Sequence, residues 1–427
     1  MAQRSPFPPV FWLANFVEVL ERFAYYGIYF SFGIYLTSLG YSRDQLGFVQ
    51  TAFLLLSYCL PIVSGTLADR FGFKPMLIVA YLAYLPSVLL LILTKSFSGI
   101  ALTMLSIGFA AGIFKPLVFG TVRAVTDKTN STLGFGIFYA MVNVGGSLGP
   151  VVAGRLRAIS WDYAFYAAAA AIGLMLVVTV LFYREPEREL EQKGFGEKLA
   201  EIREALSDRR FAGFLLMLGV VFWIPFWAFF NLCALYVDRS LDTAELYRVM
   251  RGVLGAPVAD FLSHEEGGTR RILGETISHT GYIIMIVQIA VSRVVERFRP
   301  IPAFSAGLLL AALGFVVLGA AAAGHVGLVF LGILLFAVGE MIASPRIQEY
   351  IARLAPKEKA GLYTGTNFLA VGVGAFSGVI YTPLYGRFAD AGNPGFVWFV
   401  LAAHLVVGLA VLALYLRSAG TMAEQEG

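Results

Sequence analysis

The sequence predicts an all-α membrane protein whose twelve transmembrane helices form two halves of six. Three observations support this fold class: an apolar composition, long apolar runs along the whole chain, and an internal repeat. The chain has 427 residues, of which 58% are hydrophobic and 14% charged, and its mean hydropathy is +0.74. A soluble core cannot bury so much apolar surface, so lipid must be its solvent.

Twelve apolar runs approach the length of about 20 residues that a helix needs to cross the bilayer core. The first six cover residues 11–36, 46–67, 75–93, 99–122, 133–156 and 163–183, and the second six cover 211–237, 277–295, 303–323, 326–351, 361–385 and 395–416. These runs predict an N-terminal six-helix bundle over 1–183 and a C-terminal bundle over 211–427.

Two polar segments interrupt the apolar runs. Residues 184–210 are rich in charge and place Phe195, Leu199, Ile202 and Leu206 at helical spacing, which predicts an amphipathic linker helix on the cytoplasmic membrane surface. Residues 238–276 are expected to form an extracytoplasmic insertion with one or two short helices.

An internal repeat supports the division into halves. Asp69, Arg70 and Phe71 follow the second run, and Glu296, Arg297 and Phe298 follow the eighth. The same offset relates Gly112 of the fourth run to Gly339 of the tenth. Parallel repeats of this kind predict a substrate site near the bilayer midplane, between the two halves.

Lysine and arginine in the short loops predict the orientation, because such loops are richer in these residues on the cytoplasmic side. The richer side holds Arg70, Lys74, Arg123, Lys128, Arg293, Arg297, Arg299, Arg353, Lys357, Lys359 and Arg417. The poorer side holds Arg43, Lys95, Arg155, Arg157 and Arg387. Both termini are therefore expected in the cytoplasm, with no cleaved signal peptide at the N-terminus.

Composition argues against an enzyme. Cys59 and Cys233 both lie inside apolar runs, which favours small buried side chains over a disulfide or a metal site. Four scattered histidines and two isolated cysteines offer neither a nucleophile with its base nor a metal cluster. No cofactor and no metal are expected. The net charge of +4 lies largely in loops, so the expected partners are a small-molecule substrate, protons and membrane lipid rather than nucleic acid. The chain is expected to act as a monomer.

Charged residues inside the first apolar run are the strongest functional signal. Glu18, Glu21 and Arg22 lie within five positions, and each charge in mid-bilayer costs about 3 kcal/mol on insertion scales. Such charges need partners and a polar cavity. Steps of three and four residues place Tyr25 and Tyr29 on the same helical stripe as Glu18 and Arg22. The alternative is an ion-pair cluster with a structural role only.

A second motif follows the second run, where Gly65, Asp69, Arg70, Gly72 and Lys74 surround a glycine turn. The motif resembles the signature that major facilitator transporters carry in this loop. An acid and bases at such a turn can lock neighbouring helix ends, and we expect Asp69, Arg70 and Lys74 to act as a conformational latch. The alternative is a solvated basic loop.

More of the chain resembles the proton-dependent oligopeptide transporter (POT) family within that superfamily. The resemblance lies in the first-run motif and in Tyr58, Pro61, Lys115, Pro116, Phe138, Tyr139, Asn143, Gly145, Ser147, Glu340, Ser344, Pro345, Leu354, Ala355 and Pro356. It implies that Glu18, Glu21, Arg22 and Lys115 form a proton-responsive salt-bridge network. It also implies that Asn143 and Glu340 hold a substrate amino group. If Lys115 were not part of such a site, it would be a snorkelling residue.

The chain departs from the family pattern at the expected substrate site. Tyr29 stands where a second arginine is usual, and Trp227 stands near the position of a usual acidic residue. With Tyr25, Tyr26 and Tyr58, these residues predict an aromatic substrate pocket with Lys115 as its main cation.

The function predicted is proton-coupled symport of a peptide-like or amine-bearing small molecule by rocking-bundle alternating access, in the bacterial inner membrane. Two alternatives remain open. One is a proton-coupled antiporter that exports an amphipathic compound, and the other is a non-transporting receptor on the same scaffold.

Overall fold

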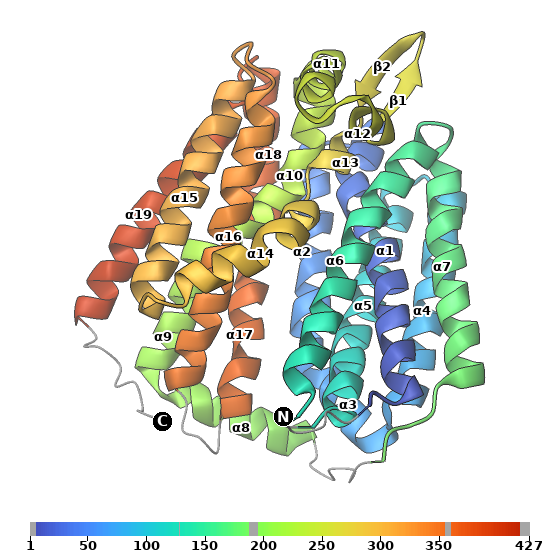
Figure 1. Ribbon diagram of the computed structural model, residues 1–427, viewed down its shortest axis with the longest axis vertical. Coiled ribbons are helices and arrows are strands. Elements are labelled where there is room, and N and C mark those ends of the chain that lie inside the picture. Colours follow the sequence, from blue (N-terminus) through green and yellow to red (C-terminus); the bar gives the residue numbers. More distant parts are fainter. Residues whose placement is uncertain (1–5, 128, 188–194, 355–359, 419–427) are drawn as a thin grey trace. The chain divides into compact units, whose positions relative to one another are not determined.

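The computed structural model describes residues 6–127, 129–187, 195–354 and 360–418, and most of them are helical (Figure 1). The chain folds into two compact units. The N-terminal unit joins Met1–Tyr41 with Ala52–Lys198, and the C-terminal unit joins Ser42–Thr51 with Leu199–Gly427. Lys128, Ala355, Pro356, Lys357 and Lys359 lie outside the described residues.

Among its described residues, the N-terminal unit has seven helices from α1 to α7, counting α2, which it shares with the C-terminal unit. They are α1 (Pro9–Ser38), α2 (Arg43–Cys59), α3 (Pro61–Phe71), α4 (Phe73–Leu93), α5 (Phe97–Ala124), α6 (Ser131–Arg157) and α7 (Trp161–Phe182). Small residues let α1 approach α6 closely. A methyl group on Gly145 or Gly149 would collide with the backbone oxygen of Val19 or Phe23. This close packing covers the face of α1 that carries Arg22.

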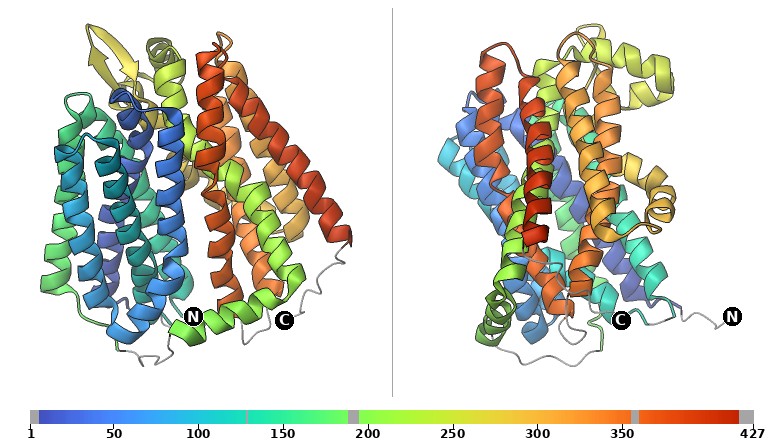
Figure 2. Two further views of the ribbon diagram at one scale, coloured as in Figure 1. Left: turned by 180° about the vertical axis from the view of Figure 1, so that it is seen from behind. Right: turned by 90° about the vertical axis from the view of Figure 1, so that its left-hand side faces the viewer.

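The C-terminal unit carries the remaining long helices. They are α8 (Phe195–Ser207), α9 (Arg209–Leu218), a π-turn η1 (Gly219–Trp223), α10 (Ile224–Ser240), α14 (Gly281–Val295), α15 (Pro300–Ala321), α16 (Leu328–Leu354), α17 (Ala360–Gly374), α18 (Ser377–Asp390) and α19 (Phe396–Ser418). Helix α15 packs on α16 through Gly307 and Gly339, where a methyl on either glycine would come within 2.7 Å of the other's carbonyl oxygen. The linker helix α8 runs across α9 rather than along it (Figure 2).

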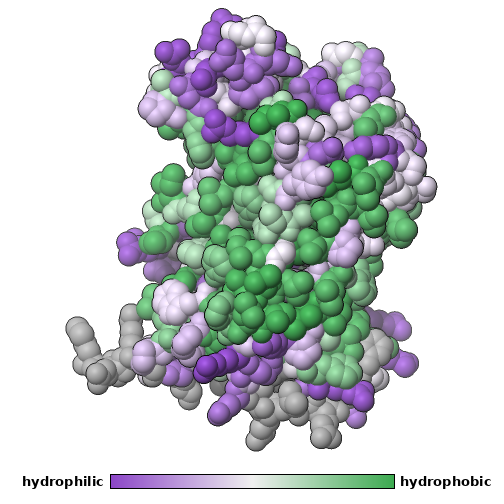
Figure 3. All heavy atoms as spheres, turned by 90° about the vertical axis from the view of Figure 1, so that its right-hand side faces the viewer, coloured by the Kyte–Doolittle hydropathy of each residue, from purple (hydrophilic) through white to green (hydrophobic). Residues whose placement is uncertain are grey.

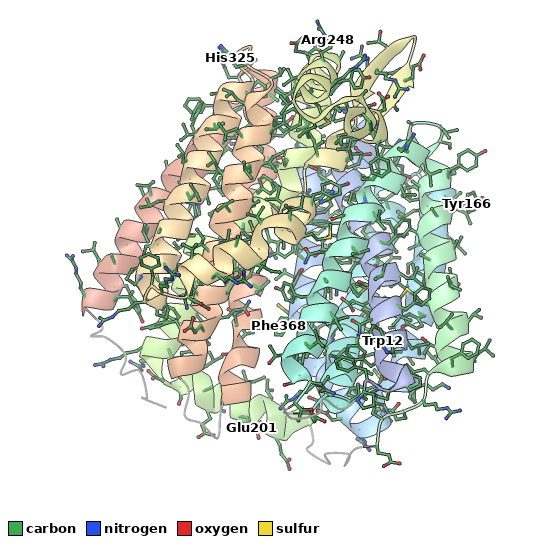
Figure 4. All side chains as sticks on the ribbon, viewed as in Figure 1. Trp12, Tyr166, Glu201, Arg248, His325 and Phe368 are labelled. Carbon is green, nitrogen blue, oxygen red and sulfur yellow. The ribbon has the colours of Figure 1, made fainter. Side chains whose placement is uncertain are left out.

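The insertion between α10 and α14 contains more structure than the sequence predicts. Its elements are α11 (Thr243–Leu254), α12 (Ala256–Phe261), β1 (Ser263–Glu266), β2 (Thr269–Ile272) and α13 (Gly274–Ile277). One or two short helices were expected, but the antiparallel hairpin was not. Its two-residue turn, Gly267 and Gly268, has φ of +56° and +76°, a conformation that glycine adopts without strain. Helix α11 carries the exposed Arg248 (Figure 4).

Capping hydrogen bonds stabilise this insertion. The Asp242 carboxylate accepts from the backbone N–H groups of Ala244 and Glu245 at the start of α11. The hydrogen bond from Glu245 is the main reason that the pKa of Asp242 lies below its ordinary value. The Tyr247 hydroxyl donates to Asp260 at 2.7 Å and joins α11 to α12.

Among the described residues, ten helices are long and apolar enough to cross a membrane, or eleven if the bent pair α2 and α3 forms one span. Helix α1 has 30 residues, about 45 Å at 1.5 Å per residue, but its three central charges exclude it from an apolar count. With α1, the predicted set of membrane helices is present. The face in Figure 3 is apolar across its middle and polar at both ends, and side chains such as Tyr166 stand outward from α7 (Figure 4).

Several predicted spans are interrupted rather than continuous. The predicted span 46–67 bends by 42° between α2 and α3, where Pro61 begins the second helix and supplies no backbone N–H. The predicted span 361–385 divides into α17 and α18. The predicted span 277–295 corresponds to α14, and residues 278–280 separate this helix from α13.

Candidate functional site

Helix α1 places two carboxylates around one guanidinium. Arg22 Nε lies 2.6 Å from Glu18 Oε1, one helical turn away, and Arg22 Nη1 lies 3.3 Å from Glu21 Oε2. Glu18 and Glu21 are fully buried, and Arg22 is 8% exposed. Gly145 of α6 allows the burial of Arg22, because the Arg22 side chain passes directly beside it. The ion pairs partly offset the cost of removing these charges from water.

Lys115 lies in a cage of tyrosine rings. Its Nζ is 3.6 Å from the Tyr58 ring centroid and 4.8 Å from that of Tyr25, and it donates to the Ser57 carbonyl at 3.2 Å. Within the described part of the chain no ion pair to Lys115 is formed. The resemblance implies a network of four residues, and this structure pairs three of them while Lys115 rests on aromatic faces.

The tyrosines expected at the site cluster on the same side of the N-terminal unit. Tyr25 contacts Tyr26 and Tyr29, with ring centroids 5.1 Å and 5.9 Å apart, and Tyr29 stacks on Phe53 at 5.2 Å. Tyr29 therefore packs as an aromatic side chain at the position where a second arginine is usual. The result is a site with one caged cation and two buried acids in the N-terminal unit.

Asn143 lies on α6, where its side-chain amide donates to the carbonyl of Tyr139 at 2.8 Å, one turn earlier in the same helix. That bond uses one of its two N–H groups, and the side-chain oxygen is an acceptor. A role in holding a substrate amino group stays a prediction.

In the C-terminal unit, Glu340 borders a small cavity with aromatic walls. The cavity is lined by Phe222, Pro225, Phe226, Leu308, Ala311, Phe336, Gly339, Glu340 and Leu405. Glu340 Oε2 accepts a hydrogen bond from the Thr280 hydroxyl at 3.1 Å. Thr280 lies directly before α14, so the break between α13 and α14 positions this donor. Of the residues that the structure describes, no cation pairs with Glu340.

Trp227 lies in the same unit and is not among the described residues that line this cavity. Its indole packs against α17, since a methyl group on Gly374 would lie 2.8 Å from Trp227 Cδ1. Its ring also contacts Phe226 and Phe230 at 5.4 Å and 5.9 Å. Contact between Trp227 and a substrate therefore stays a prediction.

The loop expected to act as a latch is held by Glu185, a residue that was not predicted to take part. The Glu185 carboxylate accepts from the backbone N–H groups of Phe73 and Lys74 at 2.6 Å and 2.8 Å. It therefore caps α4 at the positive end of the helix dipole. Lys74 Nζ donates to the Val180 carbonyl at 3.0 Å. The signal for Glu185 in the sequence is an acid just after the sixth apolar run.

Arg70 and Asp69 complete this loop. The Arg70 guanidinium lies over the ring of Phe71, 5.4 Å from its centroid. Asp69 is half-buried in the last turn of α3. Gly72 has φ of +95°, so the turn between α3 and α4 requires a residue without a side chain.

Within the C-terminal unit, a polar cluster joins the start of α2 to α10 and α18, and it was not predicted. Gln50 donates to the carbonyl of Asn231 at 3.1 Å and accepts from the Thr382 hydroxyl at 2.7 Å. Helix α2 crosses α18 at two glycines: a methyl group on Gly378 would lie 2.5 Å from the Gly47 oxygen. Each glycine is unremarkable in the sequence alone, because the contact joins residues more than 300 positions apart.

Comparison with known proteins identifies the family. A family model for the Major Facilitator Superfamily matches residues 11–378. The chain is 28% identical to quinolone resistance protein NorA of Staphylococcus aureus (strain MRSA252) over 155 residues, which is 36% of this chain and 40% of NorA. It is 21% identical over 377 residues to multidrug resistance protein 1 of Bacillus subtilis (strain 168), covering 88% of each chain.

Solved structures share the fold. A POT family transporter crystallised with 5-aminolevulinic acid aligns over 97% of both chains, with a TM-score of 0.74 and 19% identity. The nucleoside transporter NupG aligns over 95% of this chain and 99% of its own, with a TM-score of 0.71 and 12% identity. These relatives and the family are transporters rather than enzymes. The chain is therefore a multi-pass membrane protein that belongs to the major facilitator superfamily of transporters.

Proposed function

We propose that this protein is a proton-coupled symporter of a small organic substrate that bears an amine, working by alternating access. The observation that carries the proposal is the pair of carboxylates, Glu18 and Glu21, that share Arg22 inside α1. One guanidinium neutralises one carboxylate, so the second acid is a site that a proton can occupy and leave. We place the protein in the bacterial inner membrane as a monomer with both termini in the cytoplasm.

Proton binding at this cluster changes the local charge by one unit. When an acid is protonated, its hold on Arg22 weakens, and the guanidinium is free to rearrange against the remaining carboxylate. Coupling follows when the proton and the substrate favour the same conformation. The buried position of Glu18 and Glu21 favours such coupling, because charge changes in a dry environment have large energetic effects.

Glu340 supports an amine as the recognised group. Its carboxylate lies beside an aromatic cavity, and its hydrogen bond from Thr280 leaves further acceptor positions on the two oxygens. An ammonium group would form an ion pair with Glu340 and cation–π contacts with the faces of nearby phenylalanines. Lys115 is the cation proposed to bind an acidic group on the substrate. Because Tyr29 stands where a second arginine is usual, that acidic group would lack a second cation from this position. We therefore expect amines and amidated peptides to bind at least as well as free dipeptides.

A second candidate is a proton-coupled antiporter that exports an amphipathic compound. The aromatic cavity formed by Phe222, Phe226 and Phe336 and the sequence likeness to NorA and multidrug resistance protein 1 favour it. The same acids in α1 would serve either direction of flux. What separates the two is whether the substrate moves with the proton or against it.

The test is transport by purified protein in proteoliposomes under an imposed pH gradient, with dipeptides, their amides and amphipathic amines as substrates. Symport predicts accumulation on the alkaline side, and antiport predicts accumulation on the acidic side. Glu18→Gln and Glu21→Gln should each abolish proton-driven accumulation but leave counterflow exchange partly intact. Glu265→Gln, on the exposed hairpin, is the matched control and should transport normally. Wild-type accumulation by both α1 variants would refute proton coupling at this site.

A further inference from the structure

The backbone of the seventh membrane span leaves one carbonyl without a partner in its own helix. In the π-turn η1, the N–H of Ile224 donates to the Gly219 carbonyl, five residues earlier. The Val220 carbonyl would therefore need the N–H of residue 225. That residue is Pro225, which has none. A carbonyl left unpaired in an apolar environment is costly, so this turn needs a donor from elsewhere.

His404 supplies that donor. Its Nε2 lies 2.9 Å from the Val220 oxygen, and its Nδ1 is hydrogen-bonded to the Tyr381 hydroxyl. The two contacts are compatible with one neutral ring, in which Tyr381 donates to Nδ1 and Nε2–H donates to Val220. A histidine inside a helix as apolar as α19 is costly in lipid. Both nitrogens are satisfied here by a chain of bonds from α18 through α19 to the π-turn.

The π-turn carries one wall of the cavity beside Glu340. Phe222 belongs to the turn, Phe226 follows it by one helical turn, and Leu405 is the neighbour of His404; all three line the cavity. The rings of Phe222 and Phe226 are 5.6 Å apart. In a helix each residue turns the chain by about 100°, so a change in this turn would rotate the phenylalanines relative to Glu340. The His404 bond lies only two residues from Phe222.

We propose that His404 is a positioning residue that sets substrate specificity. By holding the Val220 carbonyl, it fixes the π-turn and therefore the positions of Phe222 and Phe226 that limit the size of the group bound beside Glu340. The inference rests on the proposed function in one respect, namely that Glu340 accepts an amine. His404 itself does not line the cavity, so its effect is on the choice among amines rather than on the charge that attracts them.

The experiment measures binding of linear primary alkylamines, from propylamine to decylamine, to the purified full-length protein in nanodiscs. Quenching of tryptophan fluorescence reports binding, because Trp223 and Trp227 flank Phe226. We expect His404→Leu to change the ratio of long-chain to short-chain affinity by about tenfold, the scale on which apolar pockets discriminate size. His404→Gln retains an N–H donor and should keep the wild-type ratio.

Tyr415→Phe is the matched control. The Tyr415 hydroxyl also joins α19 to a backbone carbonyl, that of Arg210 on α9, at 2.7 Å, but this bond lies away from the π-turn. The variant should keep the wild-type ratio. An unchanged ratio in folded His404→Leu protein, or an equal change in His404→Gln or Tyr415→Phe, would overturn the proposal. If His404→Leu does not fold, Tyr381→Phe is tested in its place. We expect this variant to change the ratio of long-chain to short-chain affinity by less than tenfold, and an unchanged ratio would overturn the proposal.

Hydrogen exchange separates this inference from the proposed function. If the wild-type protein binds no alkylamine, the proposal of an amine site at Glu340 is wrong. The rate of backbone hydrogen exchange in residues 219–227 then tests the role of His404 by itself. Faster exchange in His404→Leu than in His404→Gln or wild type supports the positioning role. Equal exchange in all three proteins overturns it.

Discussion

At the scale of single residues, Lys115 is the side chain whose surroundings differ most from expectation. It was expected in a salt-bridge network, but its ammonium lies over Tyr58 and Tyr25. Aromatic faces stabilise a cation without neutralising it. The charge of Lys115 therefore remains available to an anionic group, whereas that of Arg22 is already shared by two acids.

This difference leads to a prediction about substrate carboxylates. Lys115→Ala should weaken binding of a free dipeptide about tenfold, because a hydrogen bond to a charged group contributes about 1.5–3 kcal/mol. Binding of the same dipeptide with an amidated C-terminus should change little. Isothermal titration of the two ligands provides the measurement. Lys95→Ala is the control, since Lys95 also lies over a tyrosine, Tyr35. Equal losses for acid and amide in Lys115→Ala would rule out a carboxylate partner.

At the scale of elements, the cap on α4 gives the second prediction. Glu185→Ala removes both hydrogen bonds to the first turn of α4, and loss of a helix cap costs about 1 kcal/mol. We expect a lower thermal unfolding temperature and slower transport with unchanged substrate affinity. Glu187→Ala, two residues further on, is the control. A large loss of affinity with normal turnover would argue against a latch at this loop. The same assay applies to Asp69→Asn, which should likewise slow transport without weakening substrate binding.

The crossing of α2 and α18 gives the third prediction. Gly47→Ala places a methyl group against the Gly378 carbonyl, so the two helices must separate. We expect destabilisation of about 1–3 kcal/mol, the usual cost of overpacking, measured by thermal unfolding in detergent. Gly173→Ala on α7 is the control, because no atom lies within 4 Å of the added methyl. Equal stability of the two variants would show that this crossing is not tightly packed.

Most helices could be predicted from hydropathy, but their interruptions could not. An apolar run records only that a segment prefers lipid, whereas the break at Pro61 and the π-turn before Pro225 depend on backbone hydrogen bonds. Pro225 was a visible signal, since a proline inside an apolar run removes a donor. The partner of the freed carbonyl, His404, lies on another helix and needed the structure. The hairpin in the insertion was missed although Gly267–Gly268 is a turn signal.

The candidate site could be predicted only where its residues lie close together in the sequence. Spacing along α1 places Glu18 and Arg22 on one stripe, and the structure shows them bonded. Contacts between distant segments escape such arguments. Gln50 belongs to the second predicted span, but it is hydrogen-bonded to Asn231 and Thr382, which lie 181 and 332 residues further along the chain. The two glycines related by the repeat both lie at close helix contacts, Gly112 against Leu56 and Gly339 against Gly307, but the repeat alone did not predict these contacts.

At the scale of the whole molecule, the orientation in the membrane is the fourth prediction. The positive residues in short loops predict that the insertion lies outside and the linker helix inside. A cysteine at Arg248 on α11 should react with an impermeant maleimide in intact cells. A cysteine at Glu201 on α8 should react only after permeabilisation; Figure 4 marks both residues. Cys233 is buried and Cys59 half-buried, so the wild-type protein serves as the background. The reverse labelling pattern would invert the topology.

The charged centre of α1 has a consequence for how the chain enters the membrane. As α1 leaves the ribosome, its acids have only Arg22 as a partner. Helix α6, which packs on α1 beside Arg22 through Gly145, has not yet been synthesised. Each central charge costs about 3 kcal/mol on insertion. We expect a nascent chain that ends after α3 to insert α1 poorly, and one that ends after α7 to insert it fully, as glycosylation-site mapping would show. Equal insertion of both chains would contradict this order. The residues proposed to carry protons would thus also delay the membrane entry of the first helix until its packing partner, α6, has been synthesised.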